Sequence, residues 1–354
     1  MTSNMMIAAV QYAIDDIRIE ERPVPQIGSG EMLLKTLACG LCGGETMAWY
    51  KTEPKVLGHE PVGEVVELGA GVTDYKIGDR MFINHHVGRV NSHLSRRGHF
   101  TRDPFYKSMK LDPGGVCDYY RVSAQHLAMD AHVLPDGIST EEAVTIEPWS
   151  CVLSGLKVCH IQPGDTVAVV GAGFMGQGFV HLAPLFGAGK VVALDFSDWR
   201  LARAREFGAT HTINPKTEDA VEAMRVLNNG RLADTVIVIA PFPSAWDQAL
   251  ALVEVGGCLH LGAPLPPDID WVRDGNAAYF DQITVTSRYS SDHTDTYSYI
   301  RLLESGRIKA DQAISHRFDI RDSPEAFKVL VEAEKSLKIV VYPHGVPTDT
   351  QEAA

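Results

Sequence analysis

The stretch Thr166-Val167-Ala168-Val169-Val170-Gly171-Ala172-Gly173-Phe174-Met175-Gly176 decides the fold of this chain. Its apolar beginning predicts a buried strand, and its glycines mark a tight turn into a helix. Gly171 allows the turn, Gly173 lets the backbone approach a pyrophosphate, and Gly176 lets the helix pack closely on the strand. The free N–H groups of the helix that begins at Phe174 favour phosphates. The stretch therefore predicts a dinucleotide-binding unit.

An acidic residue ends the next predicted strand. Val191 to Leu194 is expected to form that strand, and Asp195 follows it directly. A carboxylate at this place accepts hydrogen bonds from the ribose hydroxyls of NAD and repels the additional phosphate of NADP. The sequence therefore predicts NAD as the cofactor.

The predicted pattern of strands and helices changes twice along the chain. Short strands and turns before about residue 140 predict a mostly antiparallel β unit. A helix is predicted to begin at Ser139 or Thr140, to be interrupted by Pro148, and to resume to about Cys159. Strands and helices then alternate, which predicts a parallel sheet covered on both faces. After about Arg288 the alternation stops, and the tail is expected to return to the first domain. The expected domains are residues 1–149, 150–287 and the return segment 288–354.

Composition limits the classes of function. A chain of 354 residues is long enough for two domains, and its net charge of −13 argues against a nucleic-acid or anionic-membrane surface. The beginning lacks the pattern of a signal peptide, and no apolar run approaches the length of a membrane span. The six cysteines show no disulfide framework. A reduced cytoplasm is the expected location, with no nucleic-acid or membrane partner.

Metal-ligand side chains precede the glycine turn. They are Cys42, the adjacent His59 and Glu60, and Glu147 before a proline. One thiolate, one imidazole and carboxylates suit a zinc ion with an open coordination position, although a single cysteine or histidine is more often a packed residue. Zinc and a nicotinamide cofactor in one chain predict hydride transfer between an alcohol and a carbonyl group.

With these motifs the chain resembles the zinc-dependent medium-chain alcohol dehydrogenases, and among them the sorbitol (polyol) dehydrogenase branch. The resemblance extends from about residue 6 to 343 and implies an α/β fold, with a Rossmann-type doubly wound parallel sheet and a mostly β, GroES-like catalytic domain. The motifs that carry it, besides the glycine turn, are Cys39-Gly40-Leu41-Cys42-Gly43, Gly58-His59-Glu60-Pro61-Val62-Gly63, Gly78-Asp79-Arg80, Asp112-Pro113-Gly114-Gly115, Ile146-Glu147-Pro148 and Ser287-Arg288-Tyr289.

The resemblance assigns roles at the metal. Cys42 and His59 are implied zinc ligands, and Glu60 is the adjacent ligand in polyol dehydrogenases. Glu147 falls where these enzymes keep a carboxylate that reaches zinc directly or through water. Glu45 matches the acid, normally Asp, that orients the ligand histidine.

The resemblance also assigns residues around the substrate and the cofactor. Trp49 aligns with an aromatic wall of the pocket, and plain packing is an equally good interpretation of it. Arg288 matches an arginine that faces the substrate, and a salt bridge on a domain seam is an equally good interpretation of it. Asp195 and Arg200 match contacts to the cofactor ribose. Relatives form dimers or tetramers through the cofactor-domain strand near residues 283–288, so a homo-dimer or homo-tetramer is expected.

The chain departs from the family at the usual proton relay. Gly44 stands where a Ser or Thr hydroxyl begins the relay, and Met47 replaces a histidine further along it. Neither residue can carry a proton. Thr46 or Glu45 on a shifted path, or a zinc-bound water with Glu147 as base, are the open alternatives.

A second departure concerns the lobe that holds a structural zinc in relatives. The four cysteine positions are Arg89, Ser92, Ser95 and Asp103 here, and none of these side chains is a thiolate. We expect Arg89 and Asp103 to pair across the lobe, and one catalytic zinc per subunit without a structural zinc. Surface or packing roles are expected for His85, His86, His93 and His99.

Three functions remain open. The first is an NAD-dependent, zinc-containing dehydrogenase of a secondary alcohol in a polyol, cyclitol or sugar-like substrate. The second is a threonine-type β-hydroxy amino-acid dehydrogenase. The third is an epimerase or lyase that retains NAD, or a binding protein, because both relay groups are missing; the intact ligands and Asp195 argue against the binding protein.

Overall fold

The chain folds into two compact units, and the computed structural model describes residues 4–47, 54–273 and 275–348. The first unit comprises Met1–Ser150 together with Ser291–Ala354, and the second comprises Cys151–Ser290. Within the described residues, no helix has both the length and the apolar character needed to cross a membrane.

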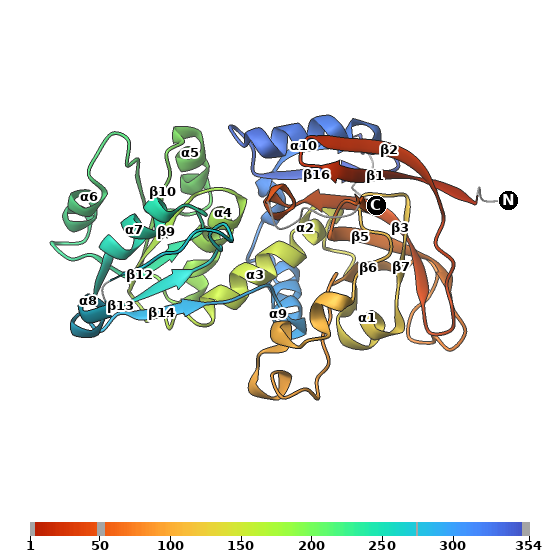
Figure 1. Ribbon diagram of the computed structural model, residues 1–354, viewed down its shortest axis with the longest axis horizontal. Coiled ribbons are helices and arrows are strands. Elements are labelled where there is room, and N and C mark those ends of the chain that lie inside the picture. Colours follow the sequence, from red (N-terminus) through yellow and green to blue (C-terminus); the bar gives the residue numbers. More distant parts are fainter. Residues whose placement is uncertain (1–3, 48–53, 274, 349–354) are drawn as a thin grey trace. The chain divides into compact units, whose positions relative to one another are not determined.

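Mostly antiparallel strands build the first unit (Figure 1). Its larger sheet has the order β15-β16-β3-β5-β6-β8, with β7 also paired to β3, and its smaller sheet has the order β2-β1-β4. The strands are β1 (Met5–Ala13), β2 (Asp16–Pro23), β3 (Met32–Leu41), β4 (Lys55–Val56), β5 (Glu60–Leu68), β6 (Arg80–Ile83), β7 (Tyr119–Val122), β8 (Ala131–Val133), β15 (Ile314–Asp319) and β16 (Lys338–Tyr342).

The C-terminal segment completes this unit. Strand β16 pairs antiparallel with β3, with Ile339 opposite Leu41, and all five residues of β16 are buried. Phe327 of α10 packs into the same apolar cluster as Ile339 and Leu41. Distant parts of the sequence therefore share one core.

The helices of this unit are α1 (Ala124–Met129), α2 (Thr140–Val144), α3 (Ile146–Leu156, which continues into the second unit), α9 (His293–Glu304) and α10 (Ser323–Glu332). Its short 3-10 turns are η1 (Gly43–Thr46), η3 (Ser95–Arg97), η4 (Phe100–Arg102), η5 (Tyr106–Ser108), η7 (Ala310–Ala313) and η8 (Ile320–Asp322).

The second unit contains a parallel sheet in the order β11-β10-β9-β12-β13-β14. Counted along the chain from β9, this is the strand order 3-2-1-4-5-6 of a dinucleotide-binding fold. Every residue of β9 is buried, as expected for a strand covered on both faces. The strands are β9 (Thr166–Val170), β10 (Lys190–Leu194), β11 (His211–Ile213), β12 (Ala233–Val238), β13 (Val253–Leu261) and β14 (Thr284–Ser287).

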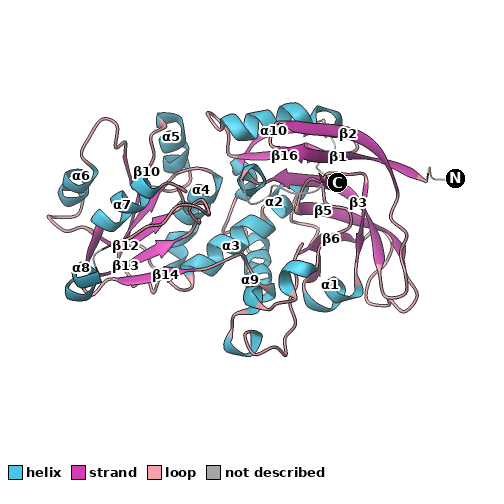
Figure 2. Cartoon of the chain, in the orientation of Figure 1, coloured by secondary structure: helices cyan, strands magenta, loops and turns pink. Residues whose placement is uncertain are grey.

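Helices cover both faces of this sheet (Figure 2). Ala168 and Val170 of β9 pack with Met224 and Trp246 from two of the helices, whereas Val169 faces Gly176 at the start of another. The predicted fold class, a doubly wound parallel sheet with a separate mostly β domain, is confirmed. The helices are α4 (Phe174–Leu182), α5 (Asp198–Glu206), α6 (Ala220–Leu227), α7 (Pro243–Ala251) and α8 (Gly275–Phe280), with a 3-10 turn η6 (Ala183–Phe186).

One local prediction was wrong. Ser139 caps α2 as expected, because its hydroxyl accepts a hydrogen bond from the Glu142 N–H at 3.1 Å. The helix breaks at Thr145, however, and Pro148 lies inside the first turn of α3. A proline is tolerated there because the first N–H groups of a helix have no partner within the helix.

Candidate metal centre and dinucleotide site

Cys42, His59 and Glu60 form one group in the first unit. Their ligand atoms all lie within 4.8 Å of one another. Cys42 directly follows β3 and His59 directly precedes β5; these strands pair antiparallel, with Gly40 opposite Glu60. The register of the sheet therefore brings the motifs together. A sulfur, a nitrogen and an oxygen donor at this spacing suit zinc.

Glu45 contacts the Nδ1 atom of the His59 ring. It lies in η1, is buried, and its Oε1 is 3.4 Å from His59 Nδ1 and accepts a hydrogen bond from the Gly58 N–H at 2.9 Å. With Nδ1 directed at a carboxylate, Nε2 is the nitrogen available to a metal. Burial opposes the charged form of His59, yet the neighbouring Cys42 and Glu45 raise its pKa well above its ordinary value. A metal ion bound here would displace that proton.

Glu60 is also engaged by a buried lysine that the sequence did not indicate. Its Oε2 is 2.6 Å from Nζ of Lys338 in β16, and both residues are almost fully buried. The Lys338 amine donates a second hydrogen bond to the Leu41 carbonyl at 3.1 Å. Glu60 Oε1 is buried and has no hydrogen-bond partner among the described residues. An oriented carboxylate with one open oxygen fits the ligand role.

Gly40 makes room for this carboxylate. A Cβ atom added at this position would lie 2.1 Å from Glu60 Oε2 and 2.9 Å from a methyl carbon of Val144. Any larger residue would therefore push Glu60 away from Lys338 and from Cys42.

Glu147 lies outside the group of three and contacts a histidine. It is buried in the first turn of α3, and its Oε1 is 3.7 Å from His85 Nδ1. The His85 ring lies between two others, with centroids 4.7 Å from His59 and 4.1 Å from His86. Burial first, and then the charge of its neighbours, lowers the His85 pKa well below its ordinary value, so the ring is neutral near pH 7. A surface or plain packing role had been expected for His85.

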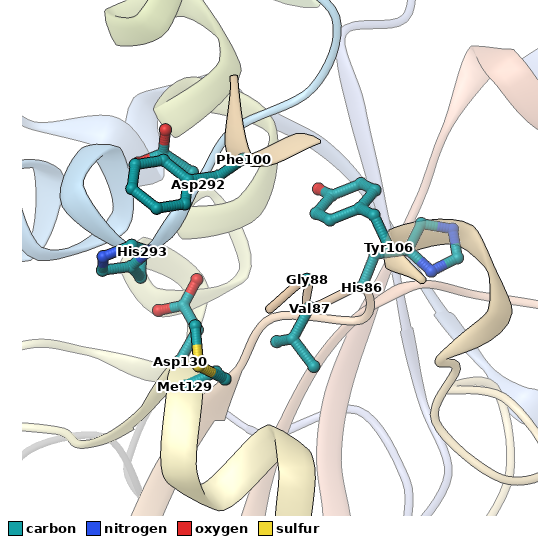
Figure 3. Close-up of a pocket in the computed structure, with 9 residues that line it drawn as sticks. All are labelled: His86, Val87, Gly88, Phe100, Tyr106, Met129, Asp130, Asp292 and His293. Atoms are coloured by element: carbon teal, nitrogen blue, oxygen red, sulfur yellow. The ribbon is translucent and has the colours of Figure 1, made fainter. Parts of the chain in front are cut away.

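A small cavity adjoins this row of rings (Figure 3). His86 and Tyr106 line one side of it, with their ring centroids 5.3 Å apart, and Asp130 and His293 line the other. Its volume is about 10 Å³. Since a single water needs about 10–15 Å³, this cavity has room for at most one water and not for a sugar-sized molecule.

The relay positions are occupied by local contacts. The Gly44 N–H donates to Cys42 Sγ at 3.3 Å, and the exposed Thr46 hydroxyl donates to the Gly43 carbonyl at 2.7 Å. Thr46 is thus engaged within its own turn. Met47 follows this turn, and Trp49 lies outside the described residues.

The lobe between Arg89 and Asp103 is held without cysteine. Arg89 Nε is 3.4 Å from Asp103 Oδ1, which confirms the predicted pair, and the Ser92 and Ser95 hydroxyls hydrogen-bond each other at 2.9 Å. Burial opposes ionisation of Asp103, but hydrogen bonds from Ser92, Phe105 and Arg89 lower its pKa. These contacts link Arg89, Ser92, Ser95 and Asp103 across the lobe.

In the second unit, the glycine turn has the geometry expected for a dinucleotide. Gly171 adopts a φ of +101°, and a Cβ on Gly176 would lie 1.9 Å from the Gly171 carbonyl oxygen. Gly173 caps α4, so the N–H groups of Phe174 and Met175 begin the helix. The positive end of this helix favours a pyrophosphate.

Asp195 lies beside this turn at the end of β10. Its Oδ2 accepts a hydrogen bond from the Ala172 N–H at 2.8 Å, and its Oδ1 accepts one from the Ser197 N–H at 2.9 Å. Arg200 Nη1 is 3.7 Å from the same carboxylate. The structure thus brings together the residues expected at the ribose.

Arg288 lies in the same unit, directly after β14, and its side chain is exposed. Its contact with substrate stays a prediction.

Comparisons with known proteins give the family. Residues 175–305 match the family described as zinc-binding dehydrogenase, and residues 28–135 match the alcohol dehydrogenase GroES-like domain. A sorbitol dehydrogenase from Gallus gallus is 32% identical over 93% of this chain and 94% of its own length. An L-threonine 3-dehydrogenase from Pyrococcus horikoshii is 30% identical over 90% and 93%, respectively.

Solved structures agree with this fold. A zinc-binding dehydrogenase from Sinorhizobium meliloti, bound to NADP, has a TM-score of 0.86 at 26% identity and covers 96% of this chain and 100% of its own. A 2R,3R-butanediol dehydrogenase from Bacillus subtilis has a TM-score of 0.84 at 25% identity, with coverage of 96% and 100%. The chain belongs to the zinc-dependent medium-chain alcohol dehydrogenase family, in its sorbitol dehydrogenase branch.

Proposed function

We propose that this oxidoreductase transfers a hydride between NAD and a secondary alcohol of a polyol, cyclitol or sugar-like substrate. The observation that carries the proposal is the group of Cys42, His59 and Glu60, in which Glu60 keeps one buried oxygen open while Lys338 holds the other. A carboxylate beside the ligand histidine accords with the sorbitol dehydrogenase relatives. Bound zinc would act as a Lewis acid that makes a substrate hydroxyl more acidic.

The residues of the chain then have separate tasks. Cys42, His59 and Glu60 would hold the metal, and Glu45 fixes the tautomer and direction of the His59 ring. We propose Glu147 as the general base that accepts the hydroxyl proton, because it is buried next to the neutral His85 and no relay hydroxyl is available at Gly44. A Glu147 that instead binds the metal is the alternative to be tested.

The choice of NAD rests on Asp195. Its carboxylate is fixed by two backbone N–H groups at the end of β10, where a 2′-phosphate would meet its negative charge. Arg200, 3.7 Å from Asp195, is the feature that favours NADP. Comparing kcat/KM for NAD and NADP decides between them: we expect NAD to be preferred, and Asp195→Ser to reduce that preference.

A screen of NADH absorbance tests the substrate class. Polyols, cyclitols and hydroxy amino acids are offered to the zinc-loaded enzyme with NAD. Turnover of a polyol or cyclitol supports the proposal, whereas selective turnover of threonine would support the second function, which the threonine dehydrogenase relatives favour. Altered substrate without net NADH would indicate an NAD-retaining epimerase or lyase.

Glu147→Gln tests the base. The substitution keeps the shape of the side chain and removes its proton affinity, so we expect kcat to fall by about 100-fold or more, within the usual range for a lost general base. Elemental analysis should still find one zinc per subunit, because Cys42, His59 and Glu60 remain. Loss of zinc would instead assign Glu147 as a metal ligand, and two zinc ions per wild-type subunit would contradict the cysteine-free lobe.

We also propose that two copies associate through β14. This strand is the last in its sheet, and its Val285 side chain is 52% exposed. Tyr279 and Phe280 of the neighbouring α8 are 76% and 75% exposed. An unpaired strand edge with exposed apolar residues is a ready surface for a second sheet. A reducing cytoplasm stays the expected location.

A further inference from the structure

Two cysteines of the second unit, which have no part in the proposed reaction, lie together. Cys159 follows α3, and Cys258 lies in β13, opposite Thr235 of β12 and Thr284 of β14. Both are buried, with 2% and 7% exposure. Thr235 is in turn opposite Val167, so Cys258 lies toward the amino end of the sheet, away from the glycine turn at the carboxyl end of β9.

The two thiols interact directly. Each thiol affects the ionisation of the other, and both residues line the same cavity. The Cys159 thiol also lies 3.2 Å from the Gly155 carbonyl, and Cys258 Sγ lies 3.6 Å from the Thr286 hydroxyl oxygen. The Cys159 thiol donates to the Gly155 carbonyl in the structure, and rotation about its Cβ–Sγ bond can direct the same hydrogen to Cys258 when Cys258 is ionised. The Thr286 hydroxyl can donate a second hydrogen bond to the Cys258 sulfur.

The pair is chemically asymmetric. The hydrogen bond from Cys159, helped by Thr286 and opposed by burial, lowers the pKa of Cys258 to about 7. The same hydrogen bond, and then burial, raises the pKa of Cys159. Because the thiolate is the reactive form, this asymmetry favours Cys258 as the nucleophile and Cys159 as the resolving thiol. Burial raises the pKa of Cys117 in the first unit, which is the usual state of a packed and inert cysteine.

Both sulfur-bearing residues line one cavity. It has a volume of about 260 Å³, and its other walls include His160, Asp234, Gly256 and Thr284. A water molecule needs only about 10–15 Å³ of such space, so a molecule of the size of hydrogen peroxide fits inside the cavity that both residues border. Low exposure of the two side chains therefore does not isolate them from small oxidants.

We propose that Cys159 and Cys258 form a redox modification site, a dithiol that hydrogen peroxide converts reversibly into a disulfide. The Cys258 thiolate attacks one peroxide oxygen, the O–O bond breaks, and with one proton taken up the products are Cys258 sulfenic acid and water. The Cys159 thiol then forms the S–S bond, and the sulfenic oxygen leaves as a second water. In total, two thiols are oxidised, one peroxide is reduced, and two waters are released. A thiol reductant restores the pair by exchange.

Peptide mapping of the zinc-loaded full-length enzyme tests this site. The reduced protein is treated with hydrogen peroxide, free thiols are alkylated, and the digest is analysed by mass spectrometry without reduction. We expect a linked peptide pair containing Cys159 and Cys258, which disappears after treatment with dithiothreitol. Cys159 and Cys258 recovered as alkylated thiols, under conditions that oxidise the other cysteines, would overturn the proposal.

Serine variants assign the two roles. In Cys159→Ser the resolving thiol is missing, so Cys258 should accumulate as sulfenic and then sulfinic acid. In Cys258→Ser, Cys159 should stay reduced. Cys117→Ser is the matched control, because it removes a buried cysteine elsewhere and should leave the linkage unchanged. Sulfinic acid at Cys258 as the main wild-type product would contradict the resolving role of Cys159; since that measurement needs no variant, poor folding of a variant does not affect it.

Discussion

At the scale of single residues, the buried pair of Glu60 and Lys338 is the contact on which the metal group depends. The charges of Glu60 and Cys42, with the hydrogen bond to Glu60, overcome burial and raise the Lys338 pKa. A lysine whose pKa is raised by folding adds to the free energy of unfolding. This contribution is complete below the lysine pKa in the unfolded chain, about 10.4, and is lost only as pH rises through the higher pKa in the folded protein. Lys338 is therefore charged at neutral pH.

Lys338→Met should consequently leave Glu60 as a buried, unpaired carboxylate. Removing one partner of such a pair costs about 3–5 kcal/mol, so we expect a clear fall in the unfolding temperature and reduced zinc content. Adding Glu60→Gln to Lys338→Met should recover part of the stability, although not the zinc. Lys335→Met, three positions earlier and exposed, is the control. Equal melting temperatures for Lys335→Met and Lys338→Met would show that the pair does not matter.

The same residues show what a sequence can and cannot indicate. Cys42 and His59 were predictable because each lies in a compact motif with a recognisable residue pattern. Lys338 was not, because it is separated from Glu60 by 278 positions and only the pairing of β16 with β3 brings it there. The contact between His85 and Glu147 was missed for the same reason: adjacency across elements leaves no local pattern.

At the scale of elements, an ion pair and side-chain hydrogen bonds hold the lobe from Arg89 to Asp103, so its order should depend on pH. Since hydrogen bonds depress the Asp103 pKa, the stabilisation is present above the unfolded value of about 3.9 and is lost as pH falls through the folded value. Asp103→Asn should loosen the lobe even at neutral pH. Limited tryptic digestion measures this, because Arg96, Arg97 and Arg102 lie in the lobe.

We expect trypsin to cleave at these arginines faster in Asp103→Asn than in wild type. In wild type, amide hydrogen exchange in η3 and η4 should be faster below pH 4 than the rates measured at higher pH would predict by extrapolation. Asp268→Asn, an exposed aspartate of the other unit, is the control. Unchanged cleavage of the Asp103 variant would mean that the Ser92 and Ser95 hydroxyls hold the lobe alone. The short turns of this lobe were not predictable, since three residues cannot display a helical period.

At the scale of the whole molecule, the proposed association through β14 can be tested by charge. If two copies join their sheets about a twofold axis, residues of β14 in one copy lie near the same residues of the other. Val285→Lys would place like charges at this edge, and edge lysines are a common way in which proteins prevent such pairing. We expect wild type to run as a multiple of 38.7 kDa in light scattering and Val285→Lys to run as a smaller species. Val226→Lys is the control, because Val226 is 80% exposed and lies on α6, which contacts β11 at the opposite edge of the sheet from β14. A monomeric wild type, or an unchanged mass for the Val285 variant, would place the contact elsewhere or remove it.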